Sequence, residues 1–441
     1  MKKLIIALAL LSGYRSIGQE SYSLKQAKEY AIQNSTQVKN SLLDVEIAQQ
    51  KIKETTATGL PQISGTVAFQ NFLDVPTSLI PASSFNPAAP ADLLIPVKFG
   101  TDFNLNGTLQ VSQLIFSGNY LVGLQASRTY KDISIQMVEK SELEIKAAVS
   151  EAYFTVVVLQ ANIRAMDSSL IMIKHIYNDT KILINEKVLE PSASLQLELS
   201  IMELENGLKQ VNDQIIVAKK LLKFQMGIEI NTEIRLADDL TTLSSGLEGE
   251  ITSTINIAEN IDYKMLQTQL KVNELLVKNK KADYLPTLAG FFSHQQVAMG
   301  NEFNFFGSDG SWYPTTIWGL NLSIPIFSGG QGPSRLKQAK IETLKTQNKI
   351  KQLDEGLQLQ TAQATTAYNN SLESQKTRER AVEIANEVLR TTEVKFKEKV
   401  VSGMELTQAQ SQVIQSKTNL INAKYEVLKA KLAIDKLVNK L

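Results

Sequence analysis

Three short motifs in the first half of the chain recur, in the same order, in the second half. Leu60-Pro61 recurs as Leu285-Pro286, Ile115-Phe116-Ser117-Gly118 recurs as Ile326-Phe327-Ser328-Gly329, and Glu186-Lys187-Val188 recurs as Glu398-Lys399-Val400. Matches in one order indicate an internal duplication, which is typical of extended, repetitive architectures. At 441 residues the chain is also longer than one ordinary domain. We therefore expect two structurally equivalent repeats.

The expected first repeat covers residues 19–230 and the second covers residues 258–441, with residues 231–257 as a connecting segment. The spacing between the first two motifs is longer in the first repeat. The stretch 75–97 accounts for the extra residues, and it contains Pro76, Pro81, Pro87, Pro90 and Pro96. Because proline is typical of turns, this insertion is predicted to be a loop.

Long helices are expected to fill most of each repeat. No glycine or proline occurs from Leu124 to Glu190, and a helix of that length would extend roughly 100 Å at ~1.5 Å per residue. The helical pattern resumes from Ala193, so a hairpin is expected at about 119–226, and a second one at about 334–441. Ser23 and Gln26 form the pattern of a capping box at the start of a shorter helix.

The hairpin surfaces are rich in Gln, Ser, Thr, Lys and Glu, with small apolar residues such as Ala364, Ala381 and Ala409. A helix in a globular core would carry a wider apolar stripe. The pattern fits helices packed side by side in a wall with water on both sides, but a plain two-stranded coiled coil explains it equally well.

Four further segments alternate between apolar and polar residues, as half-buried strands do. Strands are expected at about 63–73, 101–115, 287–299 and 315–327, and the third of these is the least regular. Their length is close to the ~9–11 residues of a tilted transmembrane strand. The candidate lipid-facing residues are Ile63, Val67, Phe69, Phe103, Leu105, Leu109, Val111, Trp318, Leu320, Leu322 and Ile324.

The alternation alone also permits a small water-soluble sheet packed on the helices. Aromatic residues gather around the four segments, which favours a membrane interface. A sheet in hydrocarbon cannot leave an edge unpaired, and single-chain barrels begin at about eight strands. If the four strands span a membrane, two or three identical chains must share a barrel of eight or twelve strands.

The first 18 residues have the pattern of a signal peptide, with Lys2 and Lys3 before an apolar run from Leu4 to Leu11. That run is far shorter than the roughly 20 residues needed to span a bilayer as a helix. No later apolar run approaches this length, so no transmembrane helix is expected.

The composition argues against several classes of function. Lys plus Arg is 46 and Asp plus Glu is 45, so no basic excess attracts nucleic acid. Cysteine is absent, which excludes thiol catalysis and thiolate metal sites. His175 and His294 lie far apart, and the Gly-rich stretch 328–333 lacks the Lys-Ser/Thr of a phosphate-binding loop. We therefore expect no enzyme, catalytic residue, metal or cofactor.

The residues resemble the TolC-like outer-membrane efflux family along essentially the whole chain after residue 18. The segment from Ser23 to Ala27, with Ala31 and Asn34, is similar to the family's opening helix. The two Leu-Pro pairs resemble its strand entries, and the two Ile-Phe-Ser-Gly motifs resemble its strand exits. Phe396 followed by the run 402–410, Ser-Gly-Met-Glu-Leu-Thr-Gln-Ala-Gln, resembles its second periplasmic turn.

The resemblance implies a mainly α-helical homotrimer with membrane β structure. Four strands per chain would build a shared 12-stranded β-barrel in the outer membrane of a Gram-negative bacterium, in contact with its lipid, and the long hairpins would form a periplasmic helical barrel. Such a channel passively conducts substrates from an inner-membrane pump, of RND or ABC type, and a periplasmic adaptor (membrane fusion) protein. The alternative is an exported structural or adhesive coiled-coil oligomer with a small β head.

The resemblance also suggests where the periplasmic aperture lies, at the two hairpin turns. Family turns usually carry glycine where this sequence has Lys187 and Lys399, and the first turn has no acid aligned with Glu405. Solvated charges at helix ends explain these residues equally well. The candidates for the tip are Glu186, Lys187, Glu190, Glu398, Lys399 and Glu405.

Overall fold

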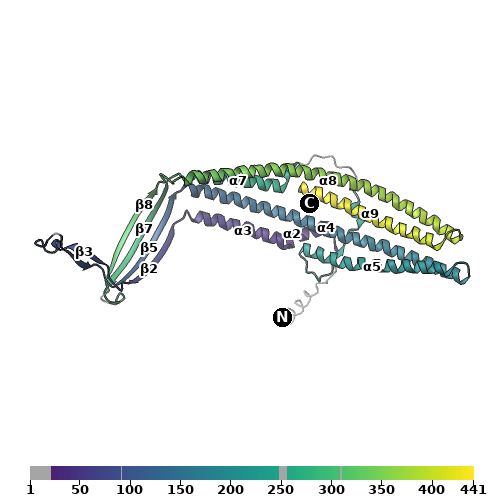
Figure 1. Cartoon of the computed structure of the whole chain (residues 1–441), viewed down its shortest axis with the longest axis horizontal. Helices are drawn as coiled ribbons and strands as arrows, with labels where there is room; N and C mark the ends of the chain where they lie inside the picture. The colour runs from purple at the N-terminus through teal and green to yellow at the C-terminus, as the bar shows by residue number, and fades with distance from the viewer. Residues whose placement is uncertain (1–20, 91, 248–255, 308–309) are drawn as a thin grey trace, which may run out of the picture. The chain divides into compact units, whose positions relative to one another are not determined.

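The computed structural model describes residues 21–90, 92–247, 256–307 and 310–441 (Figure 1). The expected signal peptide, residues 1–18, lies outside these ranges. The chain divides into two compact units. The helical unit comprises Met1–Val45, Ile133–Gln267 and Asn348–Leu441, and the sheet unit comprises Glu46–Asp132 and Thr268–Gln347.

The sheet unit contains an antiparallel sheet of four strands, in the order β2-β5-β7-β8. The strands are β2 (Gln62–Asn71), β5 (Phe103–Phe116), β7 (Thr287–Gly300) and β8 (Trp312–Ser323). Each repeat contributes two neighbouring strands. Strands β2 and β8 are the outer strands, and each has one edge unpaired within the sheet.

The prediction of a loop at residues 75–97 is wrong. Strands β3 (Thr77–Pro81) and β4 (Leu94–Lys98) form an antiparallel hairpin there, joined through the short 3-10 helix η1 (Ala82–Ser84) and an irregular segment. Both strands of a two-stranded hairpin are edge strands, so a proline in either can direct its missing N–H outward without breaking a ladder bond. This is how Pro81 and Pro96 are accommodated, opposite Leu94 and Leu79.

The helices confirm a mainly α-helical fold with long hairpins. In the first repeat they are α2 (Leu24–Asn34), α3 (Thr36–Ala57), α4 (Gly118–Asn185) and α5 (Pro191–Met226). In the second repeat they are α7 (Ile261–Ala282), α8 (Gln331–Lys397) and α9 (Gly403–Leu437). The connecting segment holds β6 (Arg235–Leu236), α6 (Leu240–Ser244) and the 3-10 helix η2 (Ile257–Glu259).

The capping box at the start of α2 is present. Ser23 Oγ accepts a hydrogen bond from the Gln26 amide at 3.3 Å, and the Gln26 side chain accepts one from the Ser23 amide at 2.9 Å. The helix is interrupted at Ser35, which has an extended ψ of 130°. Ser35 Oγ accepts from the Gln37 amide and so starts the next helix, α3.

The core of the helical unit lies where α2, α4 and α5 meet. Val149, Tyr153, Val156 and Val157 of α4 are fully buried there, against residues that include Leu222 of α5. Helix α4 contains an 18-residue window apolar enough in composition to cross a membrane, which differs from the expectation of no such helix. Part of the apolar character of α4 therefore serves this core.

A two-stranded parallel sheet fixes the start of the described chain to the connecting segment. Strand β1 (Ser21–Tyr22) pairs with β6, and the Tyr153 hydroxyl donates to the Tyr22 carbonyl oxygen at 2.9 Å. Asp238 Oδ2 lies 3.1 Å from the same hydroxyl and accepts from the Leu24 amide at 2.7 Å. Burial raises the pKa of Tyr153, so it remains a neutral donor.

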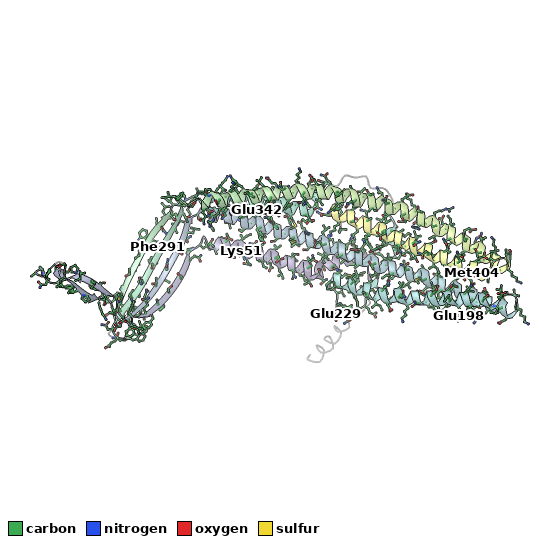
Figure 2. All side chains as sticks on the ribbon, viewed as in Figure 1. Lys51, Glu198, Glu229, Phe291, Glu342 and Met404 are labelled. Carbon is green, nitrogen blue, oxygen red and sulfur yellow. The ribbon has the colours of Figure 1, made fainter. Side chains whose placement is uncertain are left out.

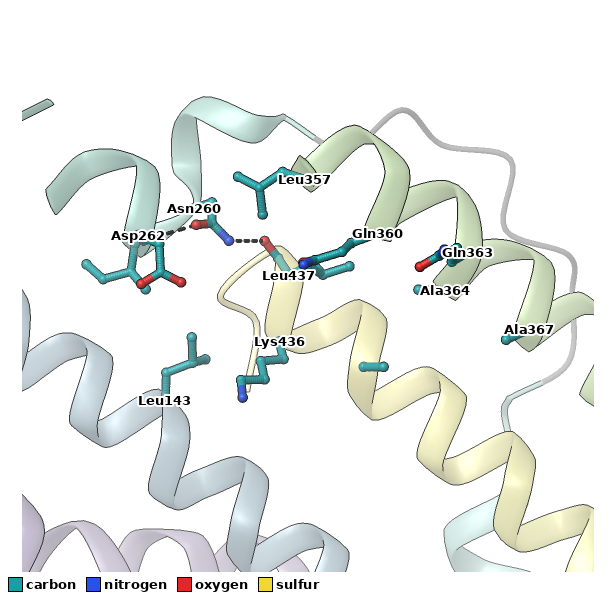
Figure 3. Close-up of a pocket in the computed structure, with 12 residues that line it drawn as sticks. Leu143, Asn260, Asp262, Leu357, Gln360, Gln363, Ala364, Ala367, Lys436 and Leu437 are labelled. Carbon is teal, nitrogen blue, oxygen red and sulfur yellow. Dashed lines mark hydrogen bonds between the residues drawn. The ribbon is translucent and has the colours of Figure 1, made fainter. Parts of the chain in front are cut away.

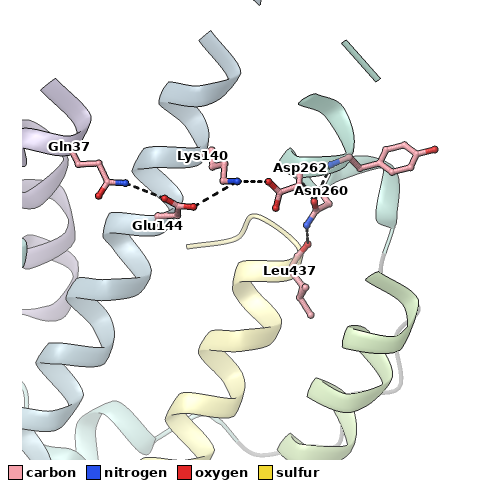
Figure 4. A network of polar contacts seen from close by, with 7 residues as sticks. Gln37, Lys140, Glu144, Asn260, Asp262 and Leu437 are labelled. Atoms are coloured by element: carbon pink, nitrogen blue, oxygen red, sulfur yellow. Dashed lines mark hydrogen bonds and ion pairs between the residues drawn. The ribbon is translucent and has the colours of Figure 1, made fainter. Parts of the chain in front are cut away.

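A second polar network joins four helices of the helical unit (Figure 4). Lys140 Nζ lies 2.7 Å from an Asp262 carboxylate oxygen, and this hydrogen bond raises the pKa of Lys140. Gln37 donates to Glu144 at 3.1 Å, and Asn260 donates to the carbonyl oxygen of Leu437 at 3.1 Å. The ion pair is partly exposed, so it contributes on the order of a few tenths of a kcal/mol.

Candidate functional site

The strand register places the predicted lipid-facing residues on one face of the sheet. One row of directly paired residues runs Ile63–Val111–Phe292–Trp318, and another runs Phe69–Leu105–Ala298–Trp312. We call the surface that these rows define the apolar face. It carries every predicted lipid-facing residue except Ile324, which follows the end of β8. Ile63, Val67 and Trp318 are between 70% and 78% exposed, so no described residue covers this face there. Leu105 differs from the prediction, because it is buried in a cluster with Ala298 and Phe305.

The opposite, polar face is lined by side chains that form hydrogen bonds readily. Thr66, Thr108, Gln295 and Thr315 form one directly paired row across the four strands. The Thr108 hydroxyl donates to the Asn106 side-chain oxygen on this face at 2.9 Å. An apolar face on one side and a polar face on the other is the arrangement of a strand set between lipid and a water-filled lumen.

Strand β7 breaks this alternation with a polar trio on the apolar face. His294 Nδ1 lies 2.7 Å from Thr316 Oγ1, and His294 Nε2 lies 3.2 Å from the Gln296 amide nitrogen. An amide nitrogen can only donate, so His294 Nε2 accepts, and the proton on Nδ1 is directed to Thr316. The irregular alternation of residues 287–296 was the signal available for this trio.

An aromatic cluster lies where β2 ends and β5 begins. The rings of Phe69 and Phe103 stack with centroids 6.1 Å apart, and Phe303 packs edge-on against Phe69 at 5.4 Å. Phe305 continues the cluster and is only 3% exposed. Aromatic rings in such a group are typical of the level where lipid hydrocarbon meets headgroups.

The two hairpin turns are built in the same way, at the same offset of 212 residues (399 − 187 = 212). The Val188 amide donates to the Leu183 carbonyl, and the Lys187 amide donates to the Ile184 carbonyl. In the second turn the corresponding bonds run from Val400 and Lys399 to earlier carbonyls. This is the Schellman motif, which ends a helix with one residue in the left-handed conformation.

That left-handed residue is a lysine in both turns, with φ of 63° at Lys187 and 64° at Lys399. Glycine is the residue usually found there, because it has no Cβ to clash. Both turns therefore lie at the repeated Glu-Lys-Val motifs, and each has lysine where glycine is usual.

The second turn starts α9 with a capping box. Ser402 Oγ accepts from the Glu405 amide at 3.3 Å, and a Glu405 carboxylate oxygen lies 3.3 Å from the Ser402 amide and 3.2 Å from its hydroxyl. In the first turn Glu190 occupies the position of Ser402 but forms no side-chain cap. All six candidate tip residues have exposed side chains, and the local hydrogen bonds give Glu405 a structural role.

A small core joins the two hairpins near their turns. Phe396, Leu406 and Ala409 are buried together, and Ile176 of α4 and Leu189 of the first turn pack against them. Figure 2 labels Glu198 and Met404, which lie on α5 and α9 toward this end of the hairpins. A Cβ added at Gly403 would come within 3.2 Å of the Ala193 Cβ, so the first turns of α5 and α9 approach closely.

The helical unit has grooves large enough to hold small molecules; two of them lie along α4, and neither resembles a catalytic site. One, of about 540 Å³, lies between α4, α8 and α9 and is lined by side chains such as Leu143, Gln360 and Lys436 (Figure 3). The other, of about 510 Å³, lies between α4 and α8 and includes His175, Asp179 and Glu393. Among the described residues, no group of three or more His, Asp or Glu is placed to hold a metal ion.

The second half of the chain, residues 256–440, matches the family model of the outer membrane efflux protein. The alkaline protease secretion protein AprF of Pseudomonas aeruginosa is 27% identical over 178 residues. That alignment spans 40% of this chain and 35% of AprF, about a third of that relative's length.

Solved outer-membrane proteins share the fold over nearly the whole chain. VceC from Vibrio cholerae superposes with a TM-score of 0.70 at 15% identity, covering 94% of this chain and 96% of VceC. CusC gives a TM-score of 0.74 at 14% identity, covering 97% and 95%. The open MtrE channel of Neisseria gonorrhoeae gives 0.71 at 15% identity, covering 94% and 88%.

At these identities the superpositions establish the fold, and the family model adds a match in sequence over the second repeat. The resemblance to the TolC-like outer-membrane efflux family is thus confirmed: residues 256–440 match the model of the outer membrane efflux protein, and the chain as a whole shares the fold of these solved outer-membrane proteins.

Proposed function

We propose that this protein is the outer-membrane channel of an efflux or export system. The observation that carries the proposal is the sheet β2-β5-β7-β8, which has one exposed apolar face and two unpaired edges. A sheet in hydrocarbon must close on itself, because each unpaired backbone group there costs several kcal/mol. Four strands are too few, so β2 of one chain would pair with β8 of the next. A trimer of such chains gives the 12-stranded barrel expected for the family.

The long hairpins fit the periplasmic part of such a channel. Their exposed residues are mostly polar, and apolar side chains such as Leu199, Met202 and Val217 of α5 remain more than half exposed within one chain. Neighbouring copies in a helical barrel would cover these side chains. The candidate tip residues would then surround the periplasmic end, where an adaptor docks and an inner-membrane pump of the RND or ABC type delivers the cargo.

The energy for transport would come from the pump, since the family consists of channels rather than enzymes. AprF is named for the secretion of a protease, so polypeptide export stands beside small-molecule efflux as a candidate function. Copurification of the inner-membrane partner would separate the two possibilities.

Membrane fractionation tests the proposal. The protein should be recovered with the outer membrane, be released only by detergent, and migrate as an oligomer that dissociates on heating. Purified oligomer should form open pores in a planar bilayer. A water-soluble mature protein would instead support the exported coiled-coil oligomer.

A further inference from the structure

The β3–β4 hairpin has no role in the channel as described so far. It connects β2 to β5, and the backbone pairing of those strands is extended by a bond from the Phe72 amide to the Asp102 carbonyl at 2.7 Å. The hairpin follows directly, with the Phe99 amide donating to the Pro76 carbonyl at 3.3 Å. It therefore lies beyond the aromatic cluster of Phe69 and Phe103, on the side away from the helices that flank the sheet (Figure 1).

One face of this hairpin is apolar and uncovered. Leu79 pairs with Pro96 and Pro81 pairs with Leu94, so these four residues share one face, which we call the hairpin face. Leu79 is 64% exposed and Leu94 is 49% exposed. Leu93, Phe85 and Phe99 nearby are at least half exposed as well. An isolated two-stranded hairpin is only marginally stable in water, so a surface of this kind calls for a partner.

Lipid is a poor candidate for that partner. Strand β2 already has 10 residues, enough to cross the apolar band of an outer membrane by itself. The aromatic cluster marks the outer limit of that band, so the hairpin lies outside the hydrocarbon. Between residues 75 and 99 only Asp92 and Lys98 are charged, and this balance gives no attraction to anionic headgroups.

A second copy of the chain fits better. The hairpin is attached to β2, whose free edge must pair with β8 of the neighbouring chain if the barrel closes, so it stands at the seam between copies. Pro81 and Pro96 lack the N–H groups that would extend a strand ladder, which favours contact through the face rather than through the strand edges. The argument rests on the proposed oligomeric channel.

We propose that the hairpin face packs against the neighbouring copies of the same chain, so that the hairpins form a collar around the outer mouth of the channel. The contact would bury Leu79 and Leu94 and would add an interface beyond the barrel and the helices. It gives the insertion in the first repeat a function in assembly.

Site-specific photo-crosslinking tests this contact. The change Leu79→p-benzoylphenylalanine places a photoreactive ketone on the hairpin face, and the same change at Ser78 places it on the opposite face of the same strand. Irradiation of whole cells should link position 79 to another copy of the chain, giving covalent dimers and trimers, and position 78 should give at least several-fold less. Adducts with lipid or with another protein, or equal yields at both positions, would overturn the proposal.

Oligomer stability gives an independent measurement. Leu79→Glu combined with Leu94→Glu should lower the temperature at which the oligomer dissociates on gels, and Ser78→Glu should leave it unchanged. An intact oligomer with unchanged dissociation temperature in the double variant would refute the collar while leaving the channel standing. Absence of any oligomer in the unaltered protein would refute the channel and the collar together.

Discussion

Replacing the two left-handed lysines should change the stability of the hairpin turns in a direction fixed by their backbone. Lys187 and Lys399 have φ near +64°, where a Cβ crowds the following carbonyl oxygen. The informative comparison is between Lys187→Gly and Lys187→Ala. Both remove the charge and the long side chain, and only the glycine variant removes the Cβ.

The expected difference is about 1 kcal/mol in favour of glycine at each turn. Left-handed backbone costs a non-glycine residue roughly 1–2 kcal/mol. Glycine also makes the unfolded chain more flexible, which offsets about 0.4–1 kcal/mol of the stability gained by removing the Cβ. Loss of the lysine charge from the helix C-terminus is common to both variants and cancels in the comparison.

Amide hydrogen exchange measures this difference locally, which matters because a large oligomer does not unfold in two states. The Val188 amide, bonded to the Leu183 carbonyl, should exchange roughly fivefold more slowly in Lys187→Gly than in Lys187→Ala, as about 1 kcal/mol implies. Glu186→Ala, one residue earlier, changes no left-handed position and provides the control. Equal exchange in the glycine and alanine variants would show that the turn stores no strain at Lys187.

Three further substitutions test the hairpin turns, the core of the helical unit and the sheet. Glu405→Gln with Glu190→Gln should raise single-channel conductance, because it removes the carboxylate charges of two residues proposed to close the aperture. The side-chain oxygen of a glutamine at position 405 can still accept the bond from the Ser402 amide, so the helix cap is kept. Unchanged conductance would remove both acids from the gate. Tyr153→Phe should destabilise the helical unit by about 1 kcal/mol, because it removes the hydroxyl that donates to the Tyr22 carbonyl and accepts from the Asp238 amide, while the Ala237 amide still donates to that carbonyl. Denaturant titration followed by far-UV circular dichroism should show a lower midpoint, and an unchanged midpoint would mean that water replaces the hydroxyl. His294→Leu should raise the urea concentration that dissociates the reconstituted oligomer, because a leucine on a lipid-facing surface is more favourable than a polar trio; a lower value would assign His294 to a buried contact instead.

Sequence patterns predicted the sheet best where one face is uniform. Residues 102–112 alternate without exception, so the faces of β5 could be assigned from the sequence. Strand β7 carries His294 and Gln296 on the apolar face, and the sequence showed these residues only as an irregular alternation. Their polar atoms are satisfied because His294 forms hydrogen bonds with both Thr316 and Gln296. Cross-strand partners cannot be read from one strand alone.

The hairpin at 75–97 and the break at Ser35 show two other limits of local reasoning. Proline argues against a central strand, but in a two-stranded hairpin there is no central strand, and the sequence does not reveal how many neighbours a strand will have. Ser35 lies in an otherwise helical pattern, and its side chain can cap the next helix as readily as it can continue the first. Only the packing of α2 and α3 decides whether Ser35 continues α2 or caps α3.

The candidate tip shows what a duplicated sequence can and cannot supply. The shared Glu-Lys-Val motif located both turns, and the structure has a Schellman motif at each. The role of Glu405 could not be inferred in the same way, because a carboxylate three residues after Ser402 fits a helix cap and an aperture equally well. The capping geometry was needed to show that this carboxylate bonds to Ser402.

The nearly equal lengths of the two hairpins restrict how this protein can evolve. Helices α4 and α8 have 68 and 67 residues, and α5 and α9 have 36 and 35. One residue inserted into a helix advances it by about 1.5 Å and rotates it by roughly 100°, so a lone insertion would separate Phe396 and Leu406 from Ile176 and Leu189. Changes of length in one hairpin are therefore tolerated only when both of its arms and the other hairpin change by the same number of turns.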